Sequence, residues 1–193
     1  MMAREERVKA ELIESCWRRA EVPLRHSKRI GICLSGNGPW WDMYRTLKLK
    51  LNSGFVTALL GTRGNGKTQL AVCLIRACCE AGRSARYVKA MDLFAAMRSG
   101  MKAGVELDAM EQWRKPSLLV IDEAHERGET QYEHRMLANL IDHRYDAMRD
   151  TLLVANQTPE SFAASISRSI ISRTHEGGET LLCDWPSYRG SKL

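Results

Sequence analysis

The chain has 193 residues, of which 44% are hydrophobic and 27% charged, a composition typical of a globular domain large enough to bury a substantial core. No apolar run approaches the ~18 residues that a membrane-spanning helix needs, so we expect no membrane contact. The first nine residues carry five charges and lack the apolar core of a signal peptide, which predicts a cytoplasmic protein.

The positive charge is concentrated at the amino-terminal end of the chain. Residues 1–50 hold 11 Lys and Arg against 6 Asp and Glu, whereas residues 51–193 hold 18 against 17. A basic leader of this kind suits nucleic acid or an acidic partner surface, and it equally suits a solvated helix face. Charge alone does not separate these interpretations.

Residues 4–20 are predicted to form an amphipathic helix that ends before Pro23. Its apolar residues recur at spacings of three and four: Val8, Leu12, Cys16, Trp17 and Ala20. A helix this short is marginally stable alone, so its apolar side needs a partner, either its own domain or another protein. We expect residues 1–23 to be a docking segment, 24–50 a linker with a second helix from Trp40 onward, and 51–193 the core domain.

The cysteines and tryptophans are expected to be structural. The six cysteines form no C-x-x-C pattern and no half of a zinc site: Cys16, Cys33, Cys73, Cys78, Cys79 and Cys183. Cys73 lies in an apolar run with helical spacing, where a reduced cysteine packs as a small hydrophobe. The tryptophans are expected in the core or beside a bound base.

Residues 61–68 match the Walker A pattern G-x-x-x-x-G-K-[ST] at every position. The apolar run 55–60 predicts a strand before this loop, and residues from about 66 to 81 have helical spacing after it. Such a loop turns its backbone N–H groups toward phosphates, while its lysine reaches the terminal phosphates and its last hydroxyl reaches Mg²⁺. We therefore predict that ATP is bound by Gly61, Thr62, Arg63, Gly64, Asn65, Gly66, Lys67 and Thr68, with Thr68 also a Mg²⁺ ligand.

Residues 117–123 form a near-continuous apolar run that ends in two carboxylates, which is typical of a Walker B strand buried on both faces. Asp122 is predicted to hold Mg²⁺, and Glu123, which points the other way along the strand, to orient the attacking water. With Ala124 and His125 these residues spell DEAH, the box of a family of nucleic-acid helicases. Those enzymes need a second motor domain, whereas only 68 residues follow His125, so we reject that interpretation and regard His125 as incidental.

The rest of the chain alternates between predicted strands and helices. In chain order we expect a strand at 85–89, a helix capped by Asp92, a helical stretch at 105–114, a helix at 131–149, a strand at 151–156, a helix at 159–172 and a strand at 180–183. Asn156, at a strand tip, is expected to contact the attacking water or the γ-phosphate, and a turn-forming Asn-Gln pair is the alternative. The alternation predicts an α/β fold with a mainly parallel, five-stranded sheet between helices.

These motifs make the chain similar to the AAA+ ATPases of the DnaC-like type, which load replicative helicases, and to the related IstB-type transposition ATPases. The resemblance covers roughly residues 22–190. Besides the Walker motifs, it rests on residues 129–133, on Ala155-Asn156-Gln157, on Ile171-Ser172-Arg173 and on Trp185-Pro186-Ser187-Tyr188-Arg189. It implies a P-loop NTPase of the AAA+ type with a short helical leader and, since only 20 residues follow Arg173, no helical lid.

The resemblance also implies a catalytic set for a Mg²⁺-dependent ATPase. In this set Lys67, Glu123 and Asn156 act on the nucleotide of their own subunit. Arg173 acts as the arginine finger that completes a neighbouring subunit's site. Arg168 is a second candidate, and a cation at a helix end is the plainer alternative for Arg173. A finger that acts between subunits implies self-association, as an open ring or spiral of about six subunits.

As a function, the resemblance implies a DNA-replication factor of a bacterial or phage-infected cell that loads the hexameric replicative helicase onto single-stranded DNA, with ATP as the switch. The leader helix is expected to grip the helicase. Arg98, Lys102 and Tyr132 are expected to meet the DNA, as cations for phosphates and one ring for base stacking. The alternative is an IstB-type transposition ATPase that binds duplex DNA and recruits a transposase. A non-hydrolysing binding module is a third hypothesis, against which the complete motifs argue.

Overall fold

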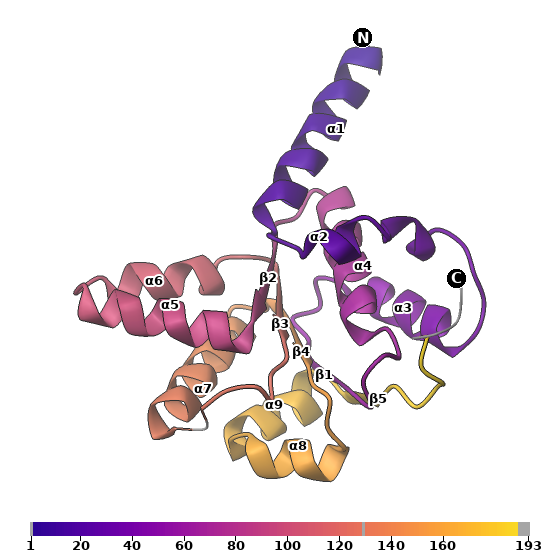
Figure 1. Ribbon diagram of the computed structural model, residues 1–193. Coiled ribbons are helices and arrows are strands. Elements are labelled where there is room, and N and C mark those ends of the chain that lie inside the picture. The colour runs from indigo at the N-terminus through magenta and orange to yellow at the C-terminus, as the bar shows by residue number, and fades with distance from the viewer. Residues whose placement is uncertain (1, 129, 189–193) are drawn as a thin grey trace.

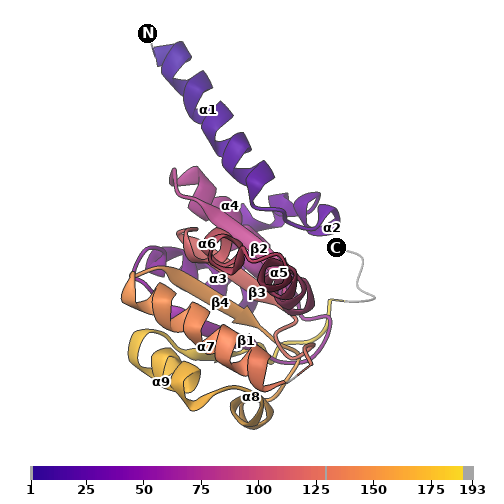
Figure 2. The same ribbon diagram turned by 90° about the vertical axis from the view of Figure 1, so that its left-hand side faces the viewer.

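The computed structural model describes residues 2–128 and 130–188, and within them it contains one five-stranded sheet (Figures 1 and 2). The spatial order is β2-β3-β4-β1-β5, and every neighbouring pair is parallel. The strands are β1 (Val56–Leu60), β2 (Ala85–Lys89), β3 (Leu118–Asp122), β4 (Asp150–Val154) and β5 (Thr180–Leu182). The predicted α/β architecture is therefore confirmed, and β4 lies between the strands that carry the two Walker motifs.

Helices cover both faces of the sheet (Figures 1 and 2). Their bounds are α1 (Met2–Arg19), α2 (Leu24–Ser27), the 3-10 turn η1 (Ile30–Cys33), α3 (Pro39–Lys50), α4 (Lys67–Glu80), α5 (Ala90–Lys102), α6 (Glu106–Arg114), α7 (Gln131–Asp146), α8 (Pro159–Ser165) and α9 (Arg168–Gly177). One core lies between the sheet and α3 and α4, and the other between the sheet and α5 to α9. The central strands β1, β3 and β4 are buried along their whole length, as their apolar runs predict.

Helix α1 projects from the domain, and only its second half packs against it (Figures 1 and 2). At its base Ala20 is fully buried, and its carbonyl accepts a hydrogen bond of 2.8 Å from the backbone N–H of Tyr87 on the edge strand β2. The Arg76 guanidinium lies 5.6 Å from the centre of the Trp17 ring. Val8 and Leu12, by contrast, are 49% and 63% exposed. The amphipathic helix is confirmed, and its own domain covers only part of its apolar side.

Three local predictions are wrong in detail. The Asp92 side chain does not cap α5, because that helix begins at Ala90, two residues before it. Residues 159–172 form two helices, because the chain is extended at Ile166 and the Ser167 hydroxyl caps α9 by accepting from the N–H of Ile170. The third concerns Cys73, which is joined to Cys33 in a disulfide rather than reduced. Packing of η1 on α4 brings the Cα atoms of Cys33 and Cys73 to 6.0 Å from each other. The two cysteines are 40 residues apart in the sequence, so no local spacing predicts that they pair.

The guanidinium of Arg144 is fully buried although it lies on the otherwise charged helix α7. It donates to the carbonyls of Trp113 and Pro116, both at 2.9 Å, before β3, and to the Thr151 hydroxyl at 2.9 Å at the start of β4. Burial lowers the pKa of Arg144 to about 9, the nearby cation Arg149 adds to that effect, and the group remains charged at neutral pH. Arg144 thus fastens the starts of two central strands to a helix. None of the helices in the described part of the chain has the length and apolar character of a bilayer span.

Replacing this buried cation should strongly destabilise the domain. We expect Arg144→Met to lower the free energy of unfolding by about 3 kcal/mol or more, because several buried oxygens lose their donor at once. Urea unfolding followed by circular dichroism measures the change. The matched control is Arg135→Met on the same helix, since Arg135 is exposed and should shift the unfolding free energy by less than about 0.5 kcal/mol. Equal effects of the two substitutions would contradict the assigned role.

Candidate functional site

The phosphate loop connects β1 to α4 at the edge of the sheet where the strands end. All three of its glycines have positive φ angles that only glycine adopts easily: 133° at Gly61, 94° at Gly64 and 83° at Gly66. A Cβ atom at Gly66 would lie 2.9 Å from the indole nitrogen of Trp40, and one at Gly61 would collide with the Cys183 carbonyl. The loop therefore needs these glycines both for its turns and for the close approach of its neighbours.

The Lys67 ammonium lies within the phosphate loop and is almost fully buried. It donates to the Gly61 carbonyl at 2.9 Å, to the Thr62 carbonyl at 2.6 Å and to the Asn65 side-chain oxygen at 3.0 Å. These contacts with oxygen atoms of the loop hold the positive charge in place. A phosphate in the loop would draw this ammonium toward its own oxygens, which are stronger, charged acceptors.

Indole N–H groups fasten the outer side of the loop. Trp40, at the start of α3, donates to the Gly66 carbonyl at 3.1 Å, and Trp185, after β5, donates to the Asn65 carbonyl at 2.6 Å. The backbone N–H of Tyr188 adds a bond of 3.0 Å to the Gly64 carbonyl. Both tryptophans are buried, as expected, but their hydrogen bonds to the loop were not predicted. The motif Trp185-Pro186-Ser187-Tyr188 was the only sequence feature that pointed to the bonds of Trp185 and Tyr188. Arg189, the last residue of that motif, lies outside the described residues.

Both oxygens of the Walker B aspartate are already paired. Asp122 is buried, its Oδ2 accepts from the Tyr87 hydroxyl at 2.7 Å, and its Oδ1 accepts from the backbone N–H of Glu123 at 2.8 Å. Burial and the adjacent Asp122 carboxylate raise the pKa of Tyr87 far above its ordinary value, so its hydroxyl remains a donor. Tyr87 lies on the neighbouring strand β2, and no pattern in the sequence predicts its contact with Asp122.

Glu123 leaves the strand in a left-handed conformation, with φ of 53°, which is unusual for a residue other than glycine. Its carboxylate pairs with Lys89, from the end of β2, at 2.8 Å. The hydrogen bond that Lys89 donates to the Glu123 carboxylate raises the pKa of Lys89 above its ordinary value. Both partners are partly exposed, and an ion pair of this kind contributes no more than about 1 kcal/mol. Little free energy is therefore needed to release Glu123.

Asn156 follows β4, the strand between β1 and β3, and so lies at the same edge as both Walker motifs. Its side-chain amide is half-buried and has no hydrogen-bond partner among the described residues, so it is available to a ligand. Its backbone N–H donates to Nδ1 of His125 at 3.3 Å. The ring of His125, which the sequence alone gives no role, therefore contacts the tip of the strand that carries Asn156.

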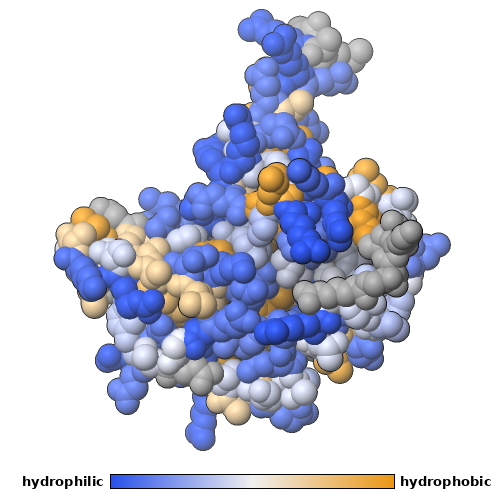
Figure 3. All heavy atoms as spheres, viewed as in Figure 1, coloured by the Kyte–Doolittle hydropathy of each residue, from blue (hydrophilic) through white to orange (hydrophobic). Residues whose placement is uncertain are grey.

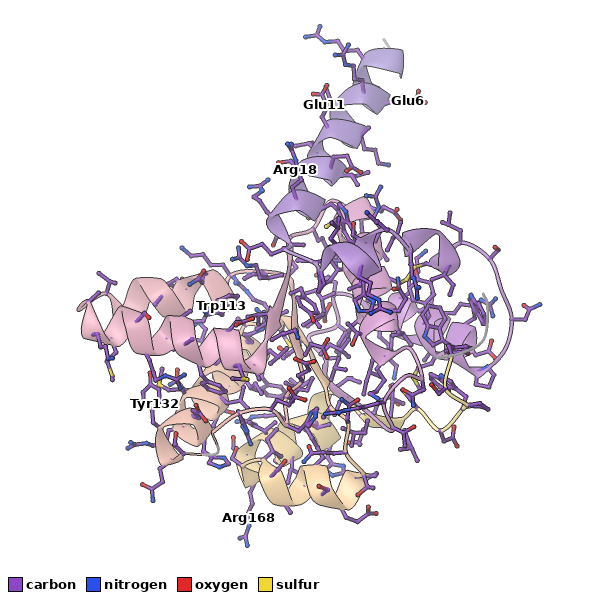
Figure 4. All side chains as sticks on the ribbon, in the orientation of Figure 1. Glu6, Glu11, Arg18, Trp113, Tyr132 and Arg168 are labelled. Atoms are coloured by element: carbon purple, nitrogen blue, oxygen red, sulfur yellow. A yellow bond between two sulfur atoms is a disulfide. The ribbon has the colours of Figure 1, made fainter. Side chains whose placement is uncertain are left out.

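The two candidate finger residues differ in how they are held. Arg173 contacts Asp142 at 3.3 Å and Glu176 at 3.3 Å, and its guanidinium lies 4.5 Å from the centre of the Tyr145 ring. The hydrogen bond with Asp142 raises the pKa of Arg173 further. Arg168, the first residue of α9, points away from the domain and has no partner among the described residues (Figure 4). Neither arginine joins the Walker residues within the same subunit.

The residues expected to meet DNA lie on α5 and α7, apart from the phosphate loop. Arg98 donates to Glu133 at 2.7 Å, and since that carboxylate is 5% exposed, the pair holds α5 against α7. Lys102 is exposed at the end of α5, and Tyr132 is half-buried in the first turn of α7 (Figure 4). Lys102 is therefore the more accessible of the two predicted cations.

A family model described as "IstB-like ATP binding protein" matches residues 51–172, which is more than half of the chain. The chain belongs to the IstB-like ATP-binding protein family. The match spans the phosphate loop, the Walker B strand and Asn156, so the ATP-binding character of the family applies to the site described above.

The relatives of this IstB-like protein include a helicase loader and a protein of an insertion sequence. The replicative helicase loader DnaC of Escherichia coli K12 is 26% identical over 132 residues, which are 67% of this chain and 54% of that protein. A putative ATP-binding protein in an insertion sequence of Mycobacterium tuberculosis is 25% identical over 147 residues, 74% of this chain and 59% of that protein. The chain spans little more than half the length of these relatives.

Solved structures confirm the fold of this IstB-like protein. The crystal structure of the DnaC helicase loader matches with a TM-score of 0.67 at 18% identity, covering 77% of this chain and 92% of that one. The replication initiator DnaA bound to AMPPCP and single-stranded DNA matches with a TM-score of 0.72 at 18% identity, covering 86% and 52%. The fold is that of an AAA+ P-loop NTPase, as predicted, and residues 183–188 after β5 contain no helix.

The bond from Trp185 should contribute to nucleotide affinity by keeping the loop in shape. We expect Trp185→Phe to weaken ATP binding about fivefold, because it removes one N–H donor of about 1 kcal/mol while keeping an aromatic ring in place. Isothermal titration calorimetry measures the Kd. Trp41→Phe is the control, since the Trp41 indole makes an equivalent 3.0 Å bond to the Ile32 carbonyl away from the loop. The account fails if both variants bind ATP as the unaltered protein does.

Proposed function

We propose that this protein is a Mg²⁺-dependent ATPase that binds the hexameric replicative helicase and loads it onto single-stranded DNA. The observation that carries the proposal is the meeting of a complete phosphate loop, two carboxylates and a free asparagine amide at one edge of the sheet, in a relative of the helicase loader DnaC. In this proposal ATP acts as a switch, since its terminal phosphate is the group that these residues would distinguish.

The oxygen groups at the site fit a magnesium ion. The Thr68 hydroxyl has no hydrogen-bond partner among the described residues, and the Asp122 carboxylate is held in a fixed orientation by Tyr87. Hydroxyl, carboxylate and phosphate oxygens are the ligands that Mg²⁺ prefers. The ion would neutralise charge on the transferring phosphoryl group, and Thr68 and Asp122 would hold it.

Hydrolysis needs a water molecule aligned with the terminal phosphate, and Glu123 is the carboxylate we assign to it. The Lys89–Glu123 pair must open first, which its weakness permits. Lys67 would stay on the terminal phosphates, and the Asn156 amide would contact the water or the γ-phosphate. Lys67 would thus hold charge, while Glu123 and Asn156 would position the nucleophile.

The remaining charge would be supplied by a neighbouring subunit in an open ring or spiral. Arg173 is the finger that the family resemblance favours, although its three contacts on its own subunit must be loosened before it reaches across. Arg168 needs no such release, so it is the second candidate. In such an assembly Lys102 and Tyr132 would meet DNA, with Arg98 contributing only if it leaves Glu133.

The helicase is proposed to dock at the leader helix. A groove of about 670 Å³ lies between α1, the end of α4, the start of β2 and the end of α6. Its apolar lining includes Leu12, Cys16 and Cys79, and its cations Lys9, Arg19 and Arg83 have no acidic partner among the described residues. It suits an apolar segment with acidic edges. Polar residues cover the projecting part of α1 beyond it (Figure 3).

The groove and the nucleotide lie at opposite edges of the sheet. The groove is built on residues 82–86 at the start of β2, whereas the phosphate loop follows the end of β1. A helicase segment and ATP can therefore be bound at the same time. A loader that releases its partner upon ATP hydrolysis requires this.

A second candidate function is that of a transposition accessory ATPase. The similarity to an insertion-sequence protein of Mycobacterium tuberculosis and the family description itself favour it. It would use the same ATP site and differ in its DNA, because such a protein would act on duplex DNA.

Removing the nucleophile-orienting carboxylate should separate binding from turnover. We expect Glu123→Gln to reduce ATP turnover at least about a hundredfold while ATP still binds, and Lys67→Ala to abolish binding. Phosphate release and calorimetry give the two readouts, and Glu111→Gln on α6 is the control. Unchanged turnover in Glu123→Gln would overturn the proposed hydrolysis. Assays with single-stranded and duplex DNA decide the second candidate: stimulation by duplex DNA only would favour transposition.

A charge placed in the groove should prevent docking. We expect Leu12→Glu to reduce co-purification with the host's replicative helicase at least about tenfold, because it adds a negative charge where acidic residues are proposed to bind. ATP affinity should not change. Leu49→Glu is the control, since Leu49 on α3 is also a solvent-exposed leucine, at 88% against 63% for Leu12, and lies outside the groove. If both variants retain the helicase, the groove is not its docking site.

A further inference from the structure

His125 links the tip of β4 to the segment that follows the Walker B strand. Its side chain is 15% exposed, and its Nδ1 lies 3.3 Å from the backbone nitrogen of Asn156. A backbone N–H can only donate, so Nδ1 must be the unprotonated, accepting nitrogen. The proton of the neutral ring is then on Nε2. This contact fixes both the tautomer and the orientation of the imidazole.

The other side of the ring faces the phosphate loop through Glu126. The buried Nε2 atom has no hydrogen-bond partner among the described residues and lies 3.6 Å from Oε1 of Glu126. The same carboxylate oxygen lies 3.2 Å from the Arg63 guanidinium. A short series of contacts therefore runs from the backbone N–H of Asn156, through the side chains of His125 and Glu126, to the guanidinium of Arg63.

Backbone hydrogen bonds flank Asn156 on both sides. The N–H of Ala155 donates to the Leu59 carbonyl at 3.0 Å, and the carbonyl of Gln157 accepts from the N–H of Gly61 at 3.1 Å. From the other neighbouring strand, the N–H of Ala124 donates to the Val154 carbonyl at 2.9 Å. The N–H of Asn156 takes part in none of these bonds, and His125 is its acceptor. The imidazole thus satisfies the backbone N–H of the residue whose side-chain amide has no hydrogen-bond partner among the described residues.

We propose that His125 is a positioning residue for ATP hydrolysis. By holding the Asn156 backbone it aims the Asn156 amide at the terminal phosphate, and through Glu126 it couples this aim to the placement of Arg63 in the phosphate loop. The inference rests on the proposed hydrolysis. A histidine that merely fills its place in the loop would matter for stability alone, which makes the two roles separable by experiment.

The test uses two side chains that mimic different nitrogens of the ring. The oxygen of Asn can take the place of Nδ1 and accept from Asn156, whereas Gln reaches the place of Nε2 and leaves that N–H without an acceptor. We expect His125→Gln to lower kcat about tenfold. Its KM and ATP affinity should stay within about twofold of those of the unaltered protein, and its melting temperature within about 2 °C. His125→Asn should retain kcat within about threefold.

Each outcome decides the matter. Wild-type kcat in His125→Gln, or an equal loss of kcat in His125→Asn and His125→Gln, would overturn the positioning role. So would a loss of kcat in His125→Gln accompanied by a large drop in melting temperature that His125→Leu reproduces, because the role would then be structural. If the unaltered protein binds ATP but shows no turnover with DNA and Mg²⁺, the proposed function itself fails and this inference fails with it.

Discussion

The structure depends on the shape of the phosphate loop, which hydrogen bonds from Trp40 and Trp185 hold in place from outside the loop. A loop with left-handed glycines loses more conformational entropy on ordering than other backbone, so it needs fixed donors around it. Two indoles and the backbone of Tyr188 supply them from segments 26 and about 120 residues away in sequence. The last described segment of the chain is therefore part of the nucleotide site.

The parallel sheet explains why the phosphate loop and the groove beside α1 lie apart. All strand ends lie at one edge, which gathers the phosphate loop, the Walker B carboxylates and Asn156 within reach of one nucleotide. All strand starts lie at the other edge, where α1 and the first residues of β2 form the groove. Contacts such as Arg144 to Thr151 tie the helices to the strand starts, so the same strands connect the groove at one edge to the Walker residues at the other.

Local patterns were enough for the sheet, and for good physical reasons. Buried parallel strands need continuous apolar runs, and the Walker motifs need particular residues at fixed spacings, so β1, β3 and β4 and their functional ends were visible in the sequence. The division of α8 from α9 was missed although Ser167 is a good cap, because Pro159 and the apolar residues after it read as one helix. The disulfide, Tyr87 on Asp122 and His125 on Asn156 depend on which segments become neighbours, and nothing in a linear pattern specifies that.

The central claim is that the phosphate loop and the segment that fastens it form one nucleotide-binding unit. Hydrogen–deuterium exchange with and without saturating ATP and Mg²⁺ tests it most directly, because amides that become ordered or bonded exchange more slowly. The account predicts slower exchange in both residues 61–68 and residues 183–188, with the start of β2 unchanged. Unaltered exchange in the phosphate loop at saturating ATP, or protection of the loop without any in residues 183–188, would contradict it.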